Sequence, residues 1–270
     1  SFGVRGTTIG DRVCLGNRSV LHACTIGDDV IIGNDCIVLD GSVIGAGSIL
    51  EDGSTVFPLQ EHKGGWVYFG HPAKPIRPVD AKELGRRMNL ARRVLAKAAN
   101  VPSRTSSEIA AQSNQAFVAS SASVGCALKM HSGTGIFFGC ELTGNHSVSI
   151  GANSNVQDNA RILTARATVE IGVSSTIGHN AVLDSCTVGD NSLVGIGSML
   201  APGTVVQSDV FLAAGSWTLP QQVLESGWLW AGRPALKVAP LKHHHRDMIA
   251  QIAAQYVEYG RYYGGMVNAQ

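Results

Sequence analysis

The chain has 270 residues, of which 44% are hydrophobic and 15% are charged, and its formal net charge is +1. This composition allows one large or two modest domains with a dry core, and the lack of a basic stripe argues against nucleic-acid binding. No run of about 18 apolar residues occurs, and no signal peptide or Arg-rich presequence follows Ser1. We therefore predict no membrane-spanning helix, and no leader unless one has been removed.

Residues 8–60 carry an aliphatic side chain at nearly every sixth position and a small residue four positions after it. A period of six fits neither an amphipathic helix nor an alternating strand, and it is typical of a solenoid of stacked coils. One large and one small inward side chain per face predict a triangular coil of three short strands. Glycine often follows the aliphatic residue, as at Gly27 and Gly45, which predicts corners with positive φ or a close backbone approach. The repeat positions include Ile26, Ile32, Val38, Ile44, Leu50 and Val56.

The segment after this repeat leaves the solenoid and enters a helix. Residues 61–79 contain Trp66 and several prolines, and Asp80 is a predicted N-cap for a helix over residues 81–99. The arginines of this helix are expected to be solvated. Residues 100–116 are polar and predict a linker. The apolar helix face comprises Leu84, Met88, Ala91 and Leu95.

A second, longer solenoid is predicted over residues 117–219, and it repeats the first after a shift of 162 residues. In both copies one step of the repeat is five residues long instead of six. This step runs from Leu21 to Ile26 in the first copy and from Leu183 to Val188 in the second. A second exit segment follows, and then a final helix over residues 242–260. The matching repeat positions are Val188, Val194, Leu200, Val206 and Leu212, and the helix face comprises Met248, Ile252, Tyr256 and Tyr259.

These elements predict an all-β solenoid in two tandem copies with two flanking α-helices. The copies are residues 1–99 and 117–270, joined by the linker at 100–116. Nothing before Ser1 corresponds to residues 117–170, so we expect the first copy to be truncated. Its open first coil then requires a cover, from another protein or from further chain.

Several other residues have both a functional and a structural interpretation. The cysteines lack metal-ligand spacing and are expected to be buried free thiols, which is compatible with a reducing compartment. The run His243–His245 is expected to be solvated or to cap the last helix rather than to bind metal. Trp66, Trp228 and Trp230 are expected to fix the exit segments rather than to line a ligand cleft. Two interpretations stay open, ordinary packing and contact with a partner or membrane surface, for Tyr256, Tyr259, Tyr262 and Tyr263.

Several motifs together resemble the γ-class carbonic anhydrases. They are Phe117-Val118-Ala119, Asn155-Val156-Gln157-Asp158, Gly178-His179 followed by Leu183-Asp184-Ser185-Cys186-Thr187, and Trp230-Ala231-Gly232-Arg233-Pro234-Ala235. The first copy has Leu21-His22-Ala23-Cys24-Thr25 and Gly70-His71-Pro72-Ala73 at the corresponding places. The resemblance implies a left-handed β-helix that forms trimers. It also implies a metal at each interface, held by three histidines, two from one subunit and one from its neighbour, and metal-hydroxide attack on carbon dioxide.

The ligand positions implied by this resemblance are poorly kept. In the second copy the first histidine position is Leu163, the Gly-His position is kept as His179, and the third position is Asp184. Gln157 and Asp158 are kept as supporting residues, whereas Thr143 and Asn145 replace the family's Arg and Asp. In the first copy Asn17 replaces the Gly-His position and His22 is kept. Leucine cannot donate to zinc, so neither copy rebuilds the site.

We therefore expect a non-catalytic scaffold subunit in a heterotrimeric γ-carbonic-anhydrase-like module with two similar subunits or domains. The resemblance implies a place on the matrix side of the mitochondrial inner membrane, against membrane-arm subunits of respiratory complex I. No cofactor is expected from this chain alone. One alternative is a zinc site to which His179 contributes and which a partner completes. A further alternative is a hexapeptide acyltransferase that uses His179 as a general base.

Overall fold

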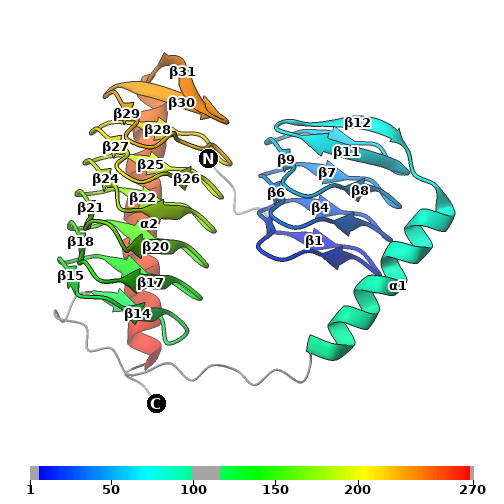
Figure 1. Cartoon of the computed structure of the whole chain (residues 1–270), viewed down its shortest axis with the longest axis horizontal. Coiled ribbons are helices and arrows are strands. Elements are labelled where there is room, and N and C mark those ends of the chain that lie inside the picture. Colours follow the sequence, from blue (N-terminus) through cyan, green and yellow to red (C-terminus); the bar gives the residue numbers. More distant parts are fainter. Residues whose placement is uncertain (1–5, 99–115, 268–270) are drawn as a thin grey trace. The chain divides into compact units, whose positions relative to one another are not determined.

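The computed structural model describes residues 6–98 and 116–267, and every structural statement below concerns those residues. The chain forms two compact units, residues 1–104 and 105–270. Each unit is a left-handed β-helix of stacked parallel coils with one α-helix, which confirms the predicted fold class (Figure 1). The predicted linker lies outside the described residues apart from Ala116.

The first unit has three sheets, one on each face of the coil. The first sheet contains β1 (Thr8–Ile9), β4 (Thr25–Ile26), β7 (Val43–Ile44) and β10 (Glu61–His62). The second contains β2 (Cys14–Leu15), β5 (Ile31–Ile32), β8 (Ile49–Leu50), β11 (Trp66–Gly70) and β12 (Ala73–Pro78). The third contains β3 (Val20–Leu21), β6 (Ile37–Val38) and β9 (Thr55–Val56).

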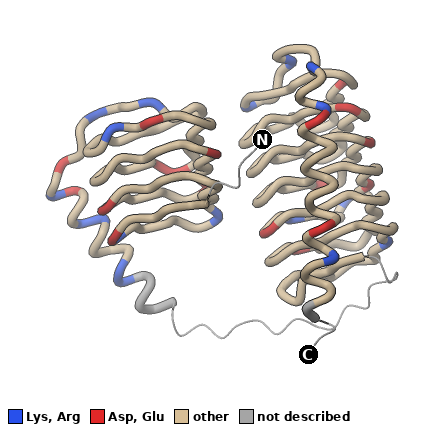
Figure 2. The backbone as a smooth tube through the Cα atoms, turned by 180° about the vertical axis from the view of Figure 1, so that it is seen from behind, with Lys and Arg blue, Asp and Glu red and all other residues tan. Residues whose placement is uncertain are grey.

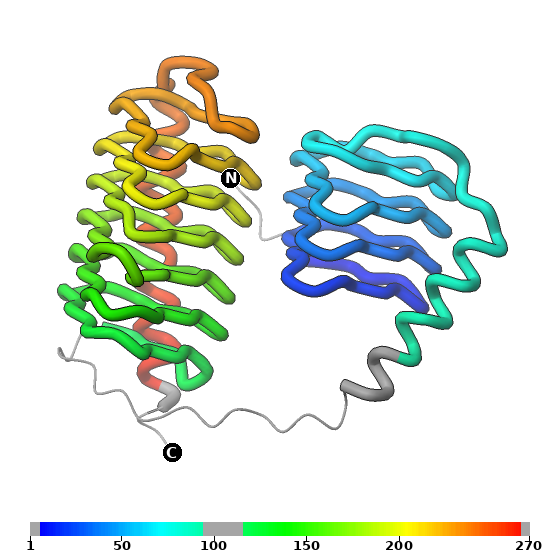
Figure 3. The backbone as a smooth tube through the Cα atoms, in the orientation of Figure 1, coloured from blue at the N-terminus to red at the C-terminus, as the bar shows by residue number. Residues whose placement is uncertain are grey.

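The second unit repeats this plan over more coils (Figure 3). One sheet contains β13 (Phe117–Val118), β16 (Gly135–Ile136), β19 (Asn155–Val156), β22 (Thr176–Ile177), β25 (Leu193–Val194), β28 (Phe211–Leu212), β30 (Trp228–Gly232) and β31 (Ala235–Pro240). The next contains β14 (Ser123–Gly125), β17 (Glu141–Gly144), β20 (Arg161–Thr164), β23 (Val182–Asp184) and β26 (Met199–Leu200). The last contains β15 (Leu128–Met130), β18 (Val148–Ile150), β21 (Val169–Ile171), β24 (Thr187–Val188), β27 (Val205–Val206) and β29 (Val223–Leu224). The ladder thus continues beyond the predicted end at residue 219.

The six-residue repeat forms the two cores. The repeat aliphatics from Ile26 to Val56 point inward and are buried, and so are the small residues four positions later, such as Cys36 and Ser48. Alternating large and small inward residues fill the triangular section without voids. Strands from successive coils pair in register, with Ile26 opposite Ile44 and Val188 opposite Val206. The sequence period therefore corresponds to one face of each coil.

The corners differ in one respect from the prediction. The glycines that follow the aliphatic residues allow a close backbone approach but do not adopt positive φ. A Cβ at Gly27 would lie 2.7 Å from the backbone nitrogen of Ala46 in the next coil. Positive φ occurs instead three positions after the aliphatic residue, at Asp29, Asp35 and Gly41 among others. Asp and Asn tolerate this conformation better than most residues, so the corners need glycine less often than we predicted.

This geometry predicts opposite effects for one substitution at two glycines of the first unit. Gly27→Ala should destabilise the unit by about 1–3 kcal/mol, since the new methyl group would overlap the next coil. Gly85→Ala should stabilise it by about 0.5–1 kcal/mol, because Gly85 is exposed on a helix with open space around it. Hydrogen exchange of peptides from residues 8–62 measures both changes. Equal effects of the two substitutions would contradict the corner assignment.

The exit segment closes one end of the first unit, and α1 (Ala81–Ala98) runs along its side, where Met88 contacts Cys14 of β2 (Figure 1). β11 and β12 form an antiparallel hairpin, and Trp66 packs against the core, as predicted. Asp80 caps α1 by accepting a hydrogen bond from the backbone N–H of Lys82 at 2.8 Å. Met88 of the predicted apolar face is buried, whereas the side chain of Leu95 lies outside the described residues.

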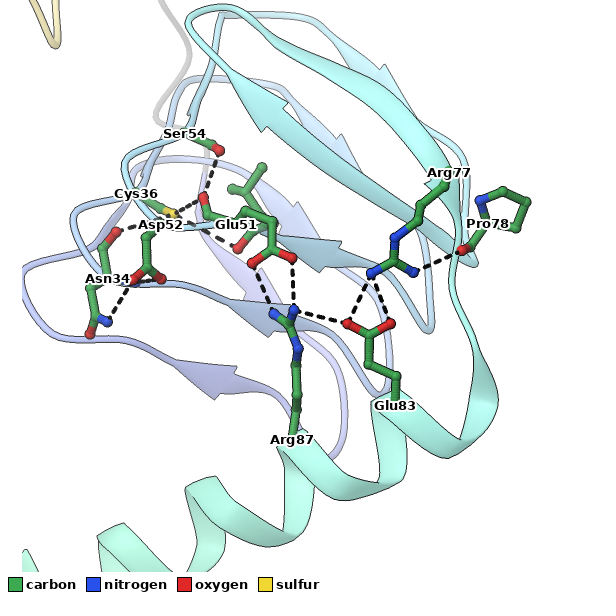
Figure 4. A network of polar contacts seen from close by, with 10 residues as sticks. Asn34, Cys36, Glu51, Asp52, Ser54, Arg77, Pro78, Glu83 and Arg87 are labelled. Carbon is green, nitrogen blue, oxygen red and sulfur yellow. Dashed lines mark hydrogen bonds and ion pairs between the residues drawn. The ribbon is translucent and has the colours of Figure 1, made fainter.

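The arginines of α1 are not all solvated. Basic residues occur along the helix (Figure 2), and Arg87 binds the Glu51 carboxylate of the solenoid through two hydrogen bonds of 2.8 and 2.9 Å. Glu83 bridges Arg87 and Arg77 at 2.9 and 2.8 Å (Figure 4). Bidentate carboxylate pairs fix orientation, so this network sets the angle at which the helix leaves the hairpin.

The final helix, α2 (His243–Val267), extends beyond the predicted end at residue 260. The helix continues through Gly260, Gly264 and Gly265, although glycine is a poor helix former. A Cβ at Gly260 would lie 3.2 Å from Cβ of Phe117, so this glycine lets the helix pack closely on β13. Tertiary packing thus outweighs local propensity. The described helices include none that is both long and apolar enough to cross a membrane.

The cysteines match the prediction of free thiols. All six are unbonded to one another, and four of them are buried. Burial raises the pKa of Cys36 to about 11 and that of Cys140 to about 12. These thiols are therefore protonated and poorly reactive at neutral pH.

Candidate functional site

The outward face of β17, β20 and β23 holds three of the family positions side by side. Leu163 lies opposite Thr143 on one neighbouring strand and opposite Asp184 on the other. Their sequence neighbours Ile162 and Leu183 point into the core, so residues 163 and 184 face outward. Adjacent strands are about 4.8 Å apart, close enough for two side chains to bind one metal ion. The structure therefore brings the first and third ligand positions together.

His179 lies at the corner that follows β22, and its ring is engaged from both sides. Tyr256 of α2 places its hydroxyl 3.1 Å from Nε2, and the Asp158 carboxylate lies 3.4 Å from Nδ1. The side chain of His179 is only 15% exposed. The histidine that the family directs toward a neighbouring subunit thus contacts the chain's own final helix.

The carboxylate of Asp158 defines the direction of these contacts. Because a carboxylate only accepts, Nδ1 of His179 donates toward it, and in the neutral imidazole Nε2 then accepts from the Tyr256 hydroxyl. Burial raises the pKa of Tyr256 well above its usual range, and the nearby Asp158 charge adds to this effect, so the phenol keeps its proton. A metal ion at Nε2 would have to displace the Tyr256 hydroxyl.

The two supporting residues stabilise the corner. The side-chain oxygen of Gln157 accepts the backbone N–H of His179 at 3.2 Å, and its amide donates to Asn155 at 3.3 Å. Asn155 in turn donates to Thr176 at 3.0 Å. Asp158 accepts the backbone N–H of Phe138 at 3.0 Å. Gln157 and Asp158 therefore have a structural role that does not depend on a metal.

The first unit keeps less of the site. His22 follows β3, and its Nδ1 lies 3.2 Å from the carboxylate of Asp40, which raises the pKa of His22. Asn17 is exposed at its corner, and its backbone N–H donates to Asn34 at 2.9 Å. We therefore regard His22 as a surface histidine in an ion pair.

The family's ligand positions in the second unit do not provide three zinc ligands within this one chain. Leu163 has no donor atom, and the carboxylate of Asp184 accepts a hydrogen bond from Ser185 at 2.9 Å. No group of three His, Cys, Asp or Glu side chains suited to a metal ion occurs within residues 6–98 and 116–267. A catalytic zinc site needs three protein ligands and an open position, and these residues do not supply them.

The other candidates have structural contacts. His245 caps α2 by accepting the backbone N–H of Lys242 at 3.2 Å, and His243 pairs with Asp247 at 2.7 Å. Trp228 and Trp230 pack against the core of the second unit, as predicted. Tyr256 and Tyr263 pack with Phe117 and Phe137, whereas Tyr259 and Tyr262 are exposed. Ordinary packing is thus confirmed for Tyr256 and Tyr263, and contact with a partner or membrane surface stays a prediction for Tyr259 and Tyr262.

The contact between Tyr256 and His179 was not predicted, because the two residues are 77 positions apart. The available signal was the predicted apolar face of the last helix, which placed Ile252 and Tyr256 on its inner side. Nothing in the sequence gives the register of that helix on the solenoid.

Removing this hydroxyl should weaken the second unit modestly. Tyr256→Phe should lower the free energy of unfolding by about 1–2 kcal/mol, because the buried Nε2 loses its donor. Tyr262→Phe is the matched control and should have little effect, because Tyr262 is exposed. Urea denaturation followed by hydrogen exchange of residues 176–194 measures both variants. An unchanged free energy of unfolding in Tyr256→Phe would mean that the contact contributes nothing to the stability of the second unit.

Comparisons with known proteins agree with the fold and the motifs. The family model "Bacterial transferase hexapeptide (six repeats)" matches residues 23–58. Gamma carbonic anhydrase 2, mitochondrial, of Arabidopsis thaliana is 36% identical over 149 residues, which is 52% of this chain and 54% of the relative. Protein YrdA of Escherichia coli is 35% identical over 122 residues, 42% of this chain and 66% of the relative. The chain spans about half the length of the mitochondrial relatives it matches.

A solved structure extends the similarity to three dimensions. A hexapeptide transferase family protein from Anaplasma phagocytophilum is 32% identical with a TM-score of 0.54, and the match covers 56% of this chain and 90% of that one. The repeat, the coils and this solved structure show that the chain belongs to the hexapeptide transferase family, and over about half of its length it is similar to the γ-class carbonic anhydrases.

Proposed function

We propose that this chain is a non-catalytic structural subunit of a γ-carbonic-anhydrase-like assembly. The observation that carries the proposal is the pairing of Leu163 with Asp184. These two positions lie together on one face, as two ligands from one subunit would, and one of them is an aliphatic residue. A scaffold can keep its coils and lose its ligands, because the coils depend on inward residues and the ligand positions point outward.

The engagement of His179 supports the same proposal. Its Nε2 accepts from Tyr256, so this nitrogen is committed within the chain. Gln157 and Asp158 support the corner without a metal. Retention of these three residues is therefore explained by folding alone.

We infer the setting from the relatives. Three of them are named mitochondrial gamma carbonic anhydrases. This supports a mitochondrial location and assembly with two similar subunits or domains as a trimer. We further propose the matrix side of the inner membrane, next to membrane-arm subunits of complex I.

The outward apolar residues on the ligand-position face support such an assembly. Met199 and Trp217 are exposed there and pair as neighbours in the ladder. Exposed aromatic and Met side chains are typical of protein interfaces.

A zinc site shared with a partner subunit remains the second candidate function. Asp184 keeps a carboxylate beside Leu163, and ligands from a partner could bind zinc together with this carboxylate and His179.

Native electrophoresis of mitochondria that express the tagged chain tests the proposal. We expect the chain to migrate in a large assembly with other γ-carbonic-anhydrase-like subunits. Met199→Asp should release it, whereas Val205→Asp, an equally exposed position on another sheet, should not. A wild-type chain that migrates as a stable monomer would contradict the proposal.

A further inference from the structure

Three basic side chains lie on the outward face of α1. Lys82, Arg86 and Arg93 are separated by four and seven residues, a spacing that places them on one side of an α-helix. All three are exposed, whereas Met88 on the opposite side is buried and contacts the solenoid. Figure 2 shows how Lys and Arg residues recur along this helix. The helix thus packs with one face and leaves a basic face in contact with solvent.

No carboxylate balances these three charges within the described residues. The ion pairs of α1 involve Glu83 and Arg87, which contact the exit segment and the solenoid. The three outward residues form no ion pair in residues 6–98 and 116–267. Like charges that lie four residues apart on a helix repel each other, so an anionic surface that neutralises them is favoured. The face is therefore complementary in charge to an anionic partner.

The fold does not require these charges. The shift of 162 residues carries the three positions onto α2, where the residues are His244, Met248 and Gln255. α2 packs on its own solenoid through Tyr256 and Tyr263 without a Lys or Arg at any of these positions. The basic face is a property of the first unit, and packing of the helix does not explain it.

An exposed leucine interrupts the basic face. Leu90 follows Arg86 by four residues and precedes Arg93 by three, so it lies between them, and it is 63% exposed. A nucleic acid offers phosphates to basic residues but no apolar environment along its backbone. The surface of an anionic bilayer offers both, because the headgroups lie directly above the acyl chains. A protein partner would need acidic residues around a pocket that fits one leucine, whereas a fluid bilayer needs no such match.

We propose that this face of α1, formed by Lys82, Arg86, Leu90 and Arg93, binds the surface of an anionic lipid bilayer. The basic side chains contact lipid phosphates, and Leu90 enters the boundary between headgroups and acyl chains. α1 lies along the surface without deeper insertion, because its apolar face is occupied by the solenoid. The contact involves the first unit alone and does not depend on the scaffold role proposed for the chain.

Binding of the full 270-residue chain to lipid vesicles tests this proposal. We expect the chain to co-sediment with vesicles of phosphatidylserine and phosphatidylcholine in equal parts, and to stay in solution with phosphatidylcholine alone. Each basic residue near an anionic bilayer contributes roughly fivefold in affinity. Lys82→Gln/Arg86→Gln/Arg93→Gln should therefore bind at least about tenfold more weakly. Glutamine is a good helix former, so circular dichroism should show an unchanged fold.

The matched control removes the same number of charges from exposed positions of the second unit. Lys129→Gln/Arg166→Gln/Lys242→Gln should keep the wild-type affinity, because salt screens charges that do not touch the bilayer. Leu90→Gln tests the apolar part of the contact. It should weaken binding at least about threefold, because the bilayer no longer buries the leucine side chain.

The outcomes separate the bilayer from other anionic partners. No binding of the wild-type chain to the anionic vesicles would overturn the proposal. Equal losses in the two triple variants would also overturn it, because net charge alone would then govern binding. Unchanged affinity in Leu90→Gln would contradict the choice of a bilayer. So would binding of the wild-type chain to polyglutamate as tight as its binding to the vesicles, because the face would then select an acidic protein.

Discussion

Replacing Leu163 and Asp184 together with histidine is expected to give zinc binding far stronger than that of the wild-type chain. The two positions are Cα partners on neighbouring strands and both point outward. Two imidazoles about 4.8 Å apart can bind one zinc ion and leave positions for a third ligand or water. Loss of one residue that only supports a metal ligand lowers metal affinity by about 10–100-fold. Two new ligands should therefore raise the zinc affinity at least about 100-fold above that of the wild-type chain. Titration against a competing zinc chelator measures it.

The control for this experiment keeps the number of histidines and changes their spacing. Thr143→His with Asp184→His places the two rings on strands separated by β20, about 9.6 Å apart. This variant should gain much less affinity than the adjacent pair. Equal gains would mean that any surface histidines suffice, and tight binding by the wild-type chain would contradict the loss of the site.

Ile44→Ala should destabilise the first unit strongly, by about 2–5 kcal/mol, because it removes a fully buried side chain from a close-packed core. Ile9 occupies the same repeat position two coils earlier in the same sheet. Because half of its surface is exposed, Ile9→Ala should cost less than about 1 kcal/mol. Hydrogen exchange of residues 25–56 measures the difference between the two variants.

The comparison of these two isoleucines separates burial from residue type. If Ile9→Ala proved as costly as Ile44→Ala, the first coil would be covered in solution. If both costs were small, the repeat positions would not form the core.

Much of the fold was predictable because the solenoid is set by a local and repeated rule. Each inward position is read directly from the period of six, and each coil contacts only its neighbours. The duplication then transfers the prediction from one unit to the other, including the exit segments at Gly70 and Gly232, which the structure shows to be antiparallel hairpins. The corners were predicted less well, since Asp29 and Asp35 adopt the positive φ that glycine was expected to supply.

The candidate site was predictable in its parts but not in its contacts. The positions of Leu163, His179 and Asp184 followed from motifs, whereas the pairing of Leu163 with Asp184 did not, because this coil is longer than the three six-residue repeats of a regular coil. The contact of His179 with Tyr256 depends on how α2 docks, and α2 extends beyond the predicted end at residue 260. Docking of a distant helix is a tertiary effect that local propensity does not encode.

The central claim is that this γ-carbonic-anhydrase-like chain keeps the coils and has lost the catalytic metal site. The zinc content of the purified chain, measured by mass spectrometry of the metal after exposure to zinc and desalting, tests it most directly. We predict far less than one zinc per chain, with Leu163→His/Asp184→His as the positive control. One tightly held zinc per wild-type chain, lost in His179→Ala, would contradict the claim.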